Sequence, residues 1–413
     1  MDLFSVVTPE DAVSKILKAL EVPDPARERV PLLDALDRVL ACPIVSPEDV
    51  PNYPKSTVDG YAVMARDTFG ASEALPAILT VTGEVFMGRP AGVLVGPGIA
   101  VRVPTGGMLP GGADAVVMVE QAEDIGDSSI GVVKGVAPGE NVVTAGQDIK
   151  KEATVLEAGK RLGPADLAGL AGLGMEEVHV FRKPRVAILS TGDEVVPVGQ
   201  RPGPGQVRDM NSTGLAAMAV RDGSEVTLMG IVEDNLDALR SAMASSLDSW
   251  DILLISGGSS VGARDLTREV IDSLGPPGVM VHGIALKPGK PAILGLSGMK
   301  PIYGLPGHPA SALVAYAAVV RPVLLRLAGE RNPRHRLAEV TAILSRSISS
   351  PVGRMDMVRV ALSQEGPGPV ASPVLGASAL ISPLMKADGY IVIPVGKNGC
   401  SAGEEVKVIL GGP

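Results

Sequence analysis

The stretch Asp251-Ile-Leu-Leu-Ile-Ser-Gly-Gly-Ser-Ser-Val-Gly-Ala-Arg-Asp265 decides the fold class that we predict for this chain. Residues 251–255 form a short apolar run typical of a buried strand, and residues 266–274 have the pattern of a helix. The small residues between them let backbone N–H groups approach an anion at the start of a helix. A strand, a Gly/Ser loop and a helix in this order are typical of α/β proteins that bind phosphate.

The loop also ends in a carboxylate, that of Asp265. An acid beside a phosphate repels it unless a divalent cation lies between the two. The stretch therefore predicts a magnesium–phosphate site. A tight loop that only caps its helix is the alternative, and this segment alone leaves both open.

Strands and helices alternate from about residue 184 to residue 328. The apolar runs predict strands at 186–190, 225–232, 252–256, 279–285 and 301–305, with helices at 213–222, 236–247, 266–274 and 309–327. This alternation indicates a parallel sheet wrapped by helices. Ligands of such sheets bind at the carboxyl ends of the strands.

The segments on either side have other patterns. Helices are expected at 9–20, where Thr8 can cap the first turn, at 32–40 and at 163–173. Short apolar runs at 77–82, 99–103 and 115–119, separated by Gly and Pro, predict a small β-rich module. Beyond a polar linker at 331–336, runs at 337–347, 355–362, 390–395 and 405–410 predict a small β-barrel or sandwich.

The composition of the 413 residues excludes several classes of protein. A net charge of −9 argues against a general binder of nucleic acid or of anionic membranes. The two cysteines lie far apart, and the four histidines show no metal-ligand spacing, so neither a disulfide framework nor a zinc site is expected. We find no run of about 18 apolar residues and no signal peptide, so we expect a soluble, cytoplasmic protein.

Charged and small residues follow each predicted strand of the α/β part. The segments are Ser190-Thr-Gly-Asp-Glu194, Glu233-Asp-Asn235, the loop to Asp265, Lys287-Pro-Gly-Lys-Pro291 and Leu305-Pro-Gly-His-Pro309. Carboxylates suit Mg²⁺, and lysines attract phosphate or another oxyanion. Taken singly, Asp234 could be a helix cap and the lysines solvated, but five such loops at one sheet edge favour a binding site.

Ordered motifs extend this pattern over nearly the whole chain. Besides those loops they include Asn52-Tyr-Pro-Lys-Ser-Thr-Val-Asp-Gly-Tyr-Ala-Val63, the Gly-rich run 104–118, and residues 139–148. Together these motifs resemble the molybdopterin molybdotransferase family, which inserts molybdenum and whose eukaryotic counterparts include the E domain of gephyrin.

The resemblance implies a multidomain α/β and β architecture. Residues 1–55 with 141–182 would form a connecting domain, 56–140 an inserted β-rich module, 183–329 a parallel α/β molybdopterin-binding domain, and 335–413 a C-terminal β-barrel. Members of the family act as homodimers whose site lies between subunits, so Asp59 and Thr105 of the module are expected to reach the partner's pocket.

The resemblance also implies a reaction. Adenylylated molybdopterin, Mg²⁺ and molybdate would react so that the pyrophosphate bond is cleaved, AMP leaves and the metal enters the dithiolene. A cation must neutralise the pyrophosphate, and molybdate must be held beside the dithiolene sulfurs. A pterin adenylyltransferase would supply the substrate and molybdoenzymes would receive the product. No nucleic acid or membrane partner is expected.

Residue roles carried over from the family form two groups. Glu194, Asp234 and Asp265 are assigned to magnesium and catalysis, and Asp148 to a further catalytic position. Substrate contacts are expected from Asp59, Thr105, Ser190, Thr191, Gly192, Ser256, Gly257, Gly258, Ser259, Gly262, Lys287, Lys290, Pro306, Gly307, Arg354, Ser378 and Ser382.

Two positions depart from the family pattern. Many relatives carry Asn where this chain has His308, and often a lysine where it has Gly283. These departures leave the choice between molybdate and tungstate open. Two other functions stay open as well: a pterin adenylyltransferase, whose likeness would be limited to the α/β part, and a non-catalytic pterin-binding scaffold, which would have no need of the acids and lysines.

Overall fold

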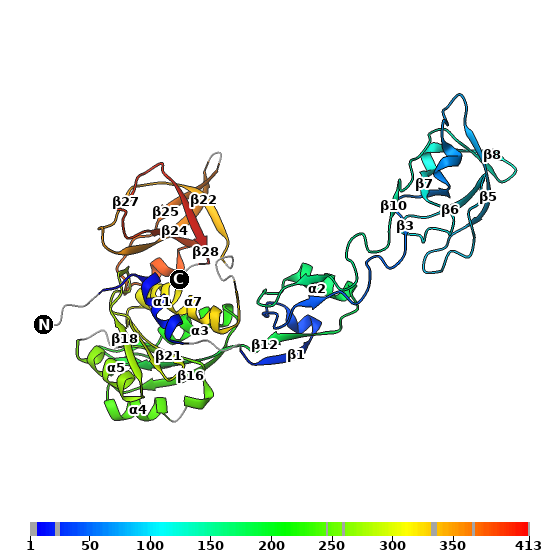
Figure 1. Ribbon diagram of the computed structural model, residues 1–413. Helices are drawn as coiled ribbons and strands as arrows, with labels where there is room; N and C mark the ends of the chain where they lie inside the picture. The colour runs from blue at the N-terminus through cyan, green and yellow to red at the C-terminus, as the bar shows by residue number, and fades with distance from the viewer. Residues whose placement is uncertain are drawn as a thin grey trace. The chain divides into compact units, whose positions relative to one another are not determined.

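The structure, a computed structural model, describes residues 6–20, 25–244, 247–257, 261–331, 337–365 and 368–411 (Figure 1). The chain divides into two compact units. One contains residues 1–42, 159–167 and 176–413, and the other contains residues 43–158 and 168–175. Each unit is described below by itself.

A six-stranded sheet forms the centre of the first unit. Its order is β16 (Glu225–Val232), β13 (Arg185–Thr191), β17 (Ile252–Ser256), β21 (Lys300–Leu305), β20 (Ile293–Ser297) and β18 (Pro277–His282). The first four strands are parallel, as predicted. The sheet is mixed, however, because β20 is an antiparallel strand that the sequence analysis missed, and β18 ends before the predicted 285.

Successive residues of β13 pack on opposite faces of this sheet, because side chains alternate along a strand. Val186 and Ile188 belong to one core and Ala187 and Leu189 to the other. The first core is covered by α1 (Pro9–Ala19), α3 (Asn211–Arg221), α6 (Pro309–Ala315), η5 (Tyr316–Val320) and α7 (Arg321–Leu327). The second is covered by α4 (Leu236–Ala244) and α5 (Val261–Ser273), and η4 (Leu247–Ser249) precedes its buried Trp250.

Helix α1 packs in the core of the α/β sheet. Thr8 caps it as predicted, accepting a hydrogen bond from the Asp11 backbone N–H at 3.1 Å. Its apolar stripe, Ala12, Ile16 and Leu20, is fully buried in the same core as the α/β sheet. The first helix therefore contributes to the core beside the α/β sheet. The expected domain boundaries, including a connecting domain that contains residues 1–55, stay predictions.

The helical segment Pro309–Leu327 is long and apolar enough to cross a membrane by length and composition, with a mean hydropathy of 1.6. However, 67% of it is buried inside the protein, which identifies it as a core helix. Its central turn, η5, is a π-helix that leads into a buried polar contact. There Tyr316 Oη and Arg321 Nε both donate to Asp222 Oδ2, at 3.0 and 2.9 Å.

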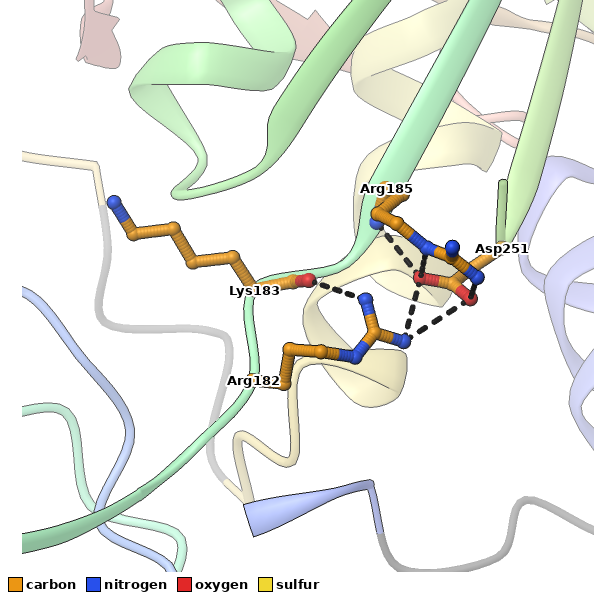
Figure 2. A network of polar contacts seen from close by, with 4 residues as sticks. All are labelled: Arg182, Lys183, Arg185 and Asp251. Atoms are coloured by element: carbon orange, nitrogen blue, oxygen red, sulfur yellow. Dashed lines mark hydrogen bonds and ion pairs between the residues drawn. The ribbon is translucent and has the colours of Figure 1, made fainter. Parts of the chain in front are cut away.

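A charged cluster holds the strands at the other end of the sheet, where β13 and β17 begin (Figure 2). Asp251 accepts hydrogen bonds from the guanidinium groups of Arg182 and Arg185 and from the Arg185 backbone N–H. Burial alone would raise the pKa of Asp251, but the Arg185 hydrogen bonds and the Arg182 charge outweigh it and lower that pKa below its usual value.

The β-rich module lies in the second unit and contains the predicted strands. Its sheet has the order β7 (Ala115–Met118), β4 (Gly60–Val63), β6 (Ile99–Val103), β5 (Ala77–Glu84), β9 (Ser129–Val132) and β8 (Ala122–Gly126). The turns η2 (Ala65–Thr68) and η3 (Val119–Gln121) connect its strands. At its base β3 (Lys55–Ser56) pairs with β10 (Val142–Val143).

Each unit also contains a short antiparallel pair of strands. In the first unit β1 (Arg27–Pro31) pairs with β12 (Glu177–Phe181), and in the second β2 (Ile44–Val45) pairs with β11 (Thr154–Leu156). The predicted helix at 163–173 is confirmed as α2 (Pro164–Gly172). The predicted helix at 32–40 is wrong: only the 3-10 turn η1 (Leu32–Ala35) forms, because Leu40 N–H donates to the Lys160 carbonyl instead of continuing a helix.

The C-terminal strands close into a barrel, as predicted. Its cycle is β24 (Met355–Glu365), β25 (Gly368–Pro373), β22 (Glu339–Leu344), β28 (Glu405–Leu410) and β26 (Gly389–Ile393), with β26 paired back to β24. Smaller elements flank it: β19 (Leu286–Lys287) pairs with β24, β23 (Ile348–Ser349) pairs with β27 (Gly399–Cys400), and α8 (Ser382–Met385) precedes β26.

Candidate functional site

The predicted edge of the α/β sheet is present. Thr191 lies opposite Val232, and Ser256 lies opposite both Ser190 and Leu305, so four parallel strands end side by side. Strand β20 begins at the same edge, because Ile293 pairs with Gly304. The loops after β13, β16, β17 and β21 therefore emerge at one edge, together with the 287–291 segment that leads into β20.

A cavity of about 230 Å³ lies at this edge. Several of its lining residues are predicted site residues, from the ends of β13, β17 and β21, and others come from β14 (Val195–Val196), β15 (Val207–Arg208), α3 and the barrel segment. They are Ser190, Thr191, Glu194, Val195, Val207, Arg208, Asp209, Met210, Asn211, Ser256, Gly257, Gly307, His308, Pro309 and Ala379. A second cavity of about 200 Å³ shares Gly257, Gly307 and His308 with the first and adds Pro306 and Ser311.

Two acidic loops meet at the end of β13. Thr191 Oγ1 donates a short hydrogen bond to Asp234 Oδ1, and the Asp234 backbone N–H donates to Asp193 Oδ1 at 3.3 Å. Glu194 lies in the cavity wall and forms no ion pair with any residue that the structure describes. Asp234 and Glu194 therefore offer carboxylate oxygens at the same strand end.

These donors have the chemistry that Mg²⁺ prefers, so the residues present fit a magnesium ion. Within the described part of the chain, no group of three or more His, Cys, Asp or Glu side chains is close enough to hold a metal. The third predicted ligand is Asp265, whose side chain lies outside the described residues. Glu194 and Asp234 follow neighbouring strands at the same sheet edge, and the magnesium set stays a prediction.

The Gly/Ser loop departs from the predicted boundary of its helix. Gly258 and Ser259 lie outside the described residues. Gly262 was expected in the loop, but α5 begins at Val261, so Gly262 belongs to the first helical turn. Gly257 explains why the loop starts with glycine: a Cβ there would lie 2.1 Å from the Thr191 carbonyl oxygen. The close passage of β13 past this residue excludes any side chain.

Lys287 is already paired with a carboxylate. Its Nζ lies 2.6 Å from Asp356 Oδ2 on the barrel, and Ser350 Oγ donates to the same oxygen at 3.1 Å. Asp356 is buried, whereas the Lys287 side chain is 43% exposed. An oxyanion at Lys287 would therefore share its charge with Asp356. Lys290, on the same loop, is exposed.

None of the three predicted barrel residues lines either cavity, but Ser378 contacts a residue that lines both. Ser378 Oγ lies 2.9 Å from His308 Nδ1, and its carbonyl accepts from the Ala310 N–H at 3.2 Å. This contact links the barrel to the loop after β21. Ser382 begins α8, and Arg354 has a buried Nε without a hydrogen-bond partner among the described residues. Neither lines one of the two cavities.

Three predicted residues lie in the second unit. Asp59 Oδ1 accepts from the Thr105 backbone N–H at 2.7 Å and from Thr105 Oγ1 at 3.1 Å. These hydrogen bonds, the backbone one first, lower the pKa of Asp59. The Asp59 carboxylate is exposed, and the expected role of both residues at a partner's pocket stays a prediction. Asp148 is exposed, and its backbone N–H donates to the Val50 carbonyl.

Sequence reasoning missed two polar residues that precede α3 or begin it. Asp209 is 8% exposed and accepts hydrogen bonds from Ser190 Oγ at 2.7 Å and from the Ser212 backbone N–H at 3.1 Å. Asn211 Nδ2 donates to Ser256 Oγ at 2.9 Å and to the Gly307 carbonyl at 2.8 Å. The Asp-Met-Asn-Ser run before a helical pattern was the available signal, because such residues commonly cap helices.

Comparison with known proteins assigns these parts to one family. Residues 7–174 match the model of the MoeA N-terminal region (domain I and II), residues 187–326 that of a probable molybdopterin binding domain, and residues 341–410 that of the MoeA C-terminal region (domain IV).

Individual relatives agree over nearly the full length. The molybdopterin molybdenumtransferase of Haemophilus influenzae is 35% identical over 98% of both chains. The Bacillus subtilis protein of the same name is 32% identical over 93% of this chain and 89% of its own. The crystal structure of the molybdopterin biosynthesis moeA protein from Pyrococcus horikoshii OT3 matches with a TM-score of 0.86 and 31% identity, covering 98% of this chain and 100% of that one. The chain belongs to the MoeA family of molybdopterin molybdenumtransferases.

Proposed function

We propose that this protein transfers molybdenum from molybdate into adenylylated molybdopterin and releases AMP. One observation carries the proposal: all three family regions are present in order, and the α/β region has a polar cavity at the carboxyl ends of its strands. Pyrophosphate cleavage needs an anion-binding loop beside acidic side chains, and the ends of β13, β16 and β17 combine these features.

The proposed binding mode follows from the strand ends. The segment Ser256–Gly262 holds the phosphates, because backbone N–H groups at a helix start attract anions. Ser190, Thr191 and Gly192 form the facing wall, and Thr191 holds Asp234 in one orientation through its hydroxyl. Pro306 and Gly307 bound the second compartment. This arrangement keeps the two acidic loops beside the phosphate loop.

Magnesium completes the site in this proposal. Glu194, Asp234 and Asp265 are the residues that would hold it, and when bound it would neutralise the pyrophosphate charge and stabilise the leaving AMP. The protein's own contribution is to orient these carboxylates and to hold the reactants together, so that their reaction becomes effectively unimolecular.

Molybdate is the proposed oxyanion substrate, and tungstate is the alternative. Lys287 and Lys290 supply positive charge on one loop, and Ser378 supplies a hydroxyl beside His308. Arg354 and Ser382 are further candidates for contacts with the oxyanion. Because Asp356 is already paired with Lys287, an oxyanion bound at Lys287 would lie beside an existing ion pair.

A homodimer in the cytoplasm is the proposed working form. Asp59 and Thr105 would then act from a partner subunit, and Asp148 would supply a further acidic position. The ready-made hydrogen bonds between Asp59 and Thr105 support a defined role for this exposed carboxylate. Molar mass measured by light scattering would test the dimer directly.

The decisive experiment measures AMP release and cofactor formation. Purified protein is incubated with adenylylated molybdopterin, Mg²⁺ and either molybdate or tungstate, and the product is scored by activation of a metal-free molybdoenzyme. Asp265→Asn and Glu194→Gln are expected to abolish both signals while the proteins stay folded. ATP consumption with bare molybdopterin would identify an adenylyltransferase, and binding without turnover would identify a scaffold.

A further inference from the structure

The side-chain amide of Asn211 has one orientation only. Its Nδ2 donates to the Gly307 carbonyl, and a carbonyl oxygen can only accept. The same nitrogen donates to Ser256 Oγ, so both amide hydrogens are in use. Asn211 thereby ties the end of β17 to the loop after β21, and its Oδ1 is left on the remaining side of the amide.

That oxygen is buried and has no hydrogen-bond partner among the residues that the structure describes. Buried acceptors without partners are rare in folded proteins, and they mark places where a donor belongs. Asn211 lines the cavity of about 230 Å³, together with Thr191, Glu194 and Gly257. A ligand in this cavity is therefore the natural source of the missing donor.

The needed donor excludes most groups of the proposed reactants. Phosphate, pyrophosphate and molybdate are acceptors when ionised, so they cannot satisfy Oδ1. The two donor-bearing parts of the substrate are the adenine and the pterin. Asparagine recognises adenine by donating and accepting at once, which needs a free amide N–H. Both N–H groups of Asn211 already donate hydrogen bonds within the protein, so Asn211 cannot recognise adenine in this way. The pterin, in contrast, presents an amino group and a ring N–H side by side, and both are donors.

We propose that Asn211 is a specificity-determining residue whose Oδ1 accepts a hydrogen bond from the amino or ring N–H edge of the pterin. The proposal rests on the proposed function and adds which end of the substrate lies against α3. Asp209, next to it in the wall, adds negative charge that favours the same donor edge. The anionic end then lies toward Gly257 and the start of α5.

The test compares two ligands on the same variants. Molybdopterin and AMP are titrated separately into the wild type and into Asn211→Ala, with affinity followed by ligand fluorescence or calorimetry. Asn211→Ala is expected to weaken molybdopterin binding by about tenfold or more and AMP binding by less than about threefold. Ser256→Ala removes one of the two acceptors of the amide, but the Gly307 carbonyl still orients Oδ1, so this variant is expected to weaken molybdopterin binding less than Asn211→Ala does.

Two further variants separate recognition from stability. Ala216→Gly weakens α3 without changing the cavity wall, and it should leave both affinities unchanged. Asn211→Asp keeps an oxygen at the Oδ1 position but sets its second oxygen against the Gly307 carbonyl, so it tests the bracing hydrogen bond and should lower the thermal midpoint. Equal loss of affinity for both ligands in Asn211→Ala would show that the amide only links the two loops, and it would overturn the proposal.

The binding measurements also distinguish a wrong assignment of Asn211 from a wrong proposed function. If the wild type binds molybdopterin and Asn211→Ala binds it equally well, the assignment of Asn211 is wrong while the proposed function stands. If the wild type binds neither molybdopterin nor AMP, the proposed function fails, and the inference fails with it.

Discussion

The two edges of the α/β sheet use acidic residues in opposite ways. At the edge where β13 and β17 begin, Asp251 is surrounded by Arg182 and Arg185, and its oxygens accept hydrogen bonds from both guanidinium groups (Figure 2). At the edge where the same strands end, Glu194 forms no ion pair with any described residue, and Asp234 accepts from the Thr191 hydroxyl. The first edge neutralises its negative charge with arginines, whereas Glu194 at the second edge has no described cationic partner.

This difference gives a physical rule for the molecule. A carboxylate paired with arginines stabilises the fold, and its loss lowers stability. A carboxylate left without a cation costs stability, and its retention points to a ligand. Substitutions at the two edges should therefore separate activity from stability.

The largest effect is expected at the edge with the cavity. Asp234→Asn keeps an oxygen for the Thr191 hydroxyl but removes the charge, so AMP release should fall about 10²–10³-fold. The thermal midpoint should stay within about 2 °C of the wild type because the hydrogen bond persists. Single-turnover kinetics and a melting curve measure both quantities. Activity within twofold of the wild type would contradict the rule.

A smaller effect, on stability, is expected at the opposite edge. Asp251→Asn removes the charge that both arginines contact, and it should lower the free energy of unfolding by about 2 kcal/mol. AMP release per folded molecule should not change. The control is Glu177→Gln, which breaks the exposed pair with Arg29 and should cost less than about 1 kcal/mol. Urea unfolding of the three proteins provides the measurement.

The same carboxylate predicts a pH dependence of stability. Because the pKa of Asp251 is lowered in the folded protein, its contribution is fully present above the unfolded value near 3.8. The contribution is lost as pH falls through the still lower folded pKa. The stability difference between the wild type and Asp251→Asn should therefore be constant from pH 7 to pH 5 and shrink below pH 3.8. A difference that grows on acidification would mean that the sign is wrong.

The smallest effect is expected where the cavity edge meets the barrel. His308→Asn keeps a hydrogen-bonding side chain opposite Ser378 Oγ, so AMP release should change by less than about threefold. His308→Ala serves as the comparison, since it removes the contact altogether. Equal rates in the two variants would show that the His308–Ser378 contact does not contribute to the site.

Much of the α/β part was predictable because its signals are local. Strands β13, β16 and β17 have continuous or nearly continuous apolar runs, and the Gly-rich turns after them identify the site edge. Strand β20, Ile293–Ser297, was missed because its short apolar run directly follows the Lys287–Pro291 loop. The run and the loop together resemble a single connection between two strands. The helix expected at 32–40 failed because hydrogen bonds to distant residues outweighed its local pattern.

The site was predictable at the level of loops rather than of individual contacts. The motifs identified Thr191, Glu194 and Ser256, which do line the cavity. Asp209 and Asn211 were missed because their importance depends on pairing with Ser190, Ser256 and Gly307, which lie 19 to 96 residues away in sequence. Likewise, nothing in the sequence pattern showed that Lys287 forms an ion pair with Asp356, because this pair joins a loop of the sheet to the barrel.

The pairing of β3 with β10 has a consequence for how the chain tolerates rearrangement. Ser56 lies opposite Val142 and Lys55 opposite Val143, so the segment enters and leaves the β-rich module at neighbouring points. The inserted module can therefore be removed as one unit. A two-residue hairpin turn that joins Ser56 to Val142 could replace it without altering the pairing register of β3 and β10. The module can therefore be exchanged for another one at this pair of strands, both in evolution and by protein engineering.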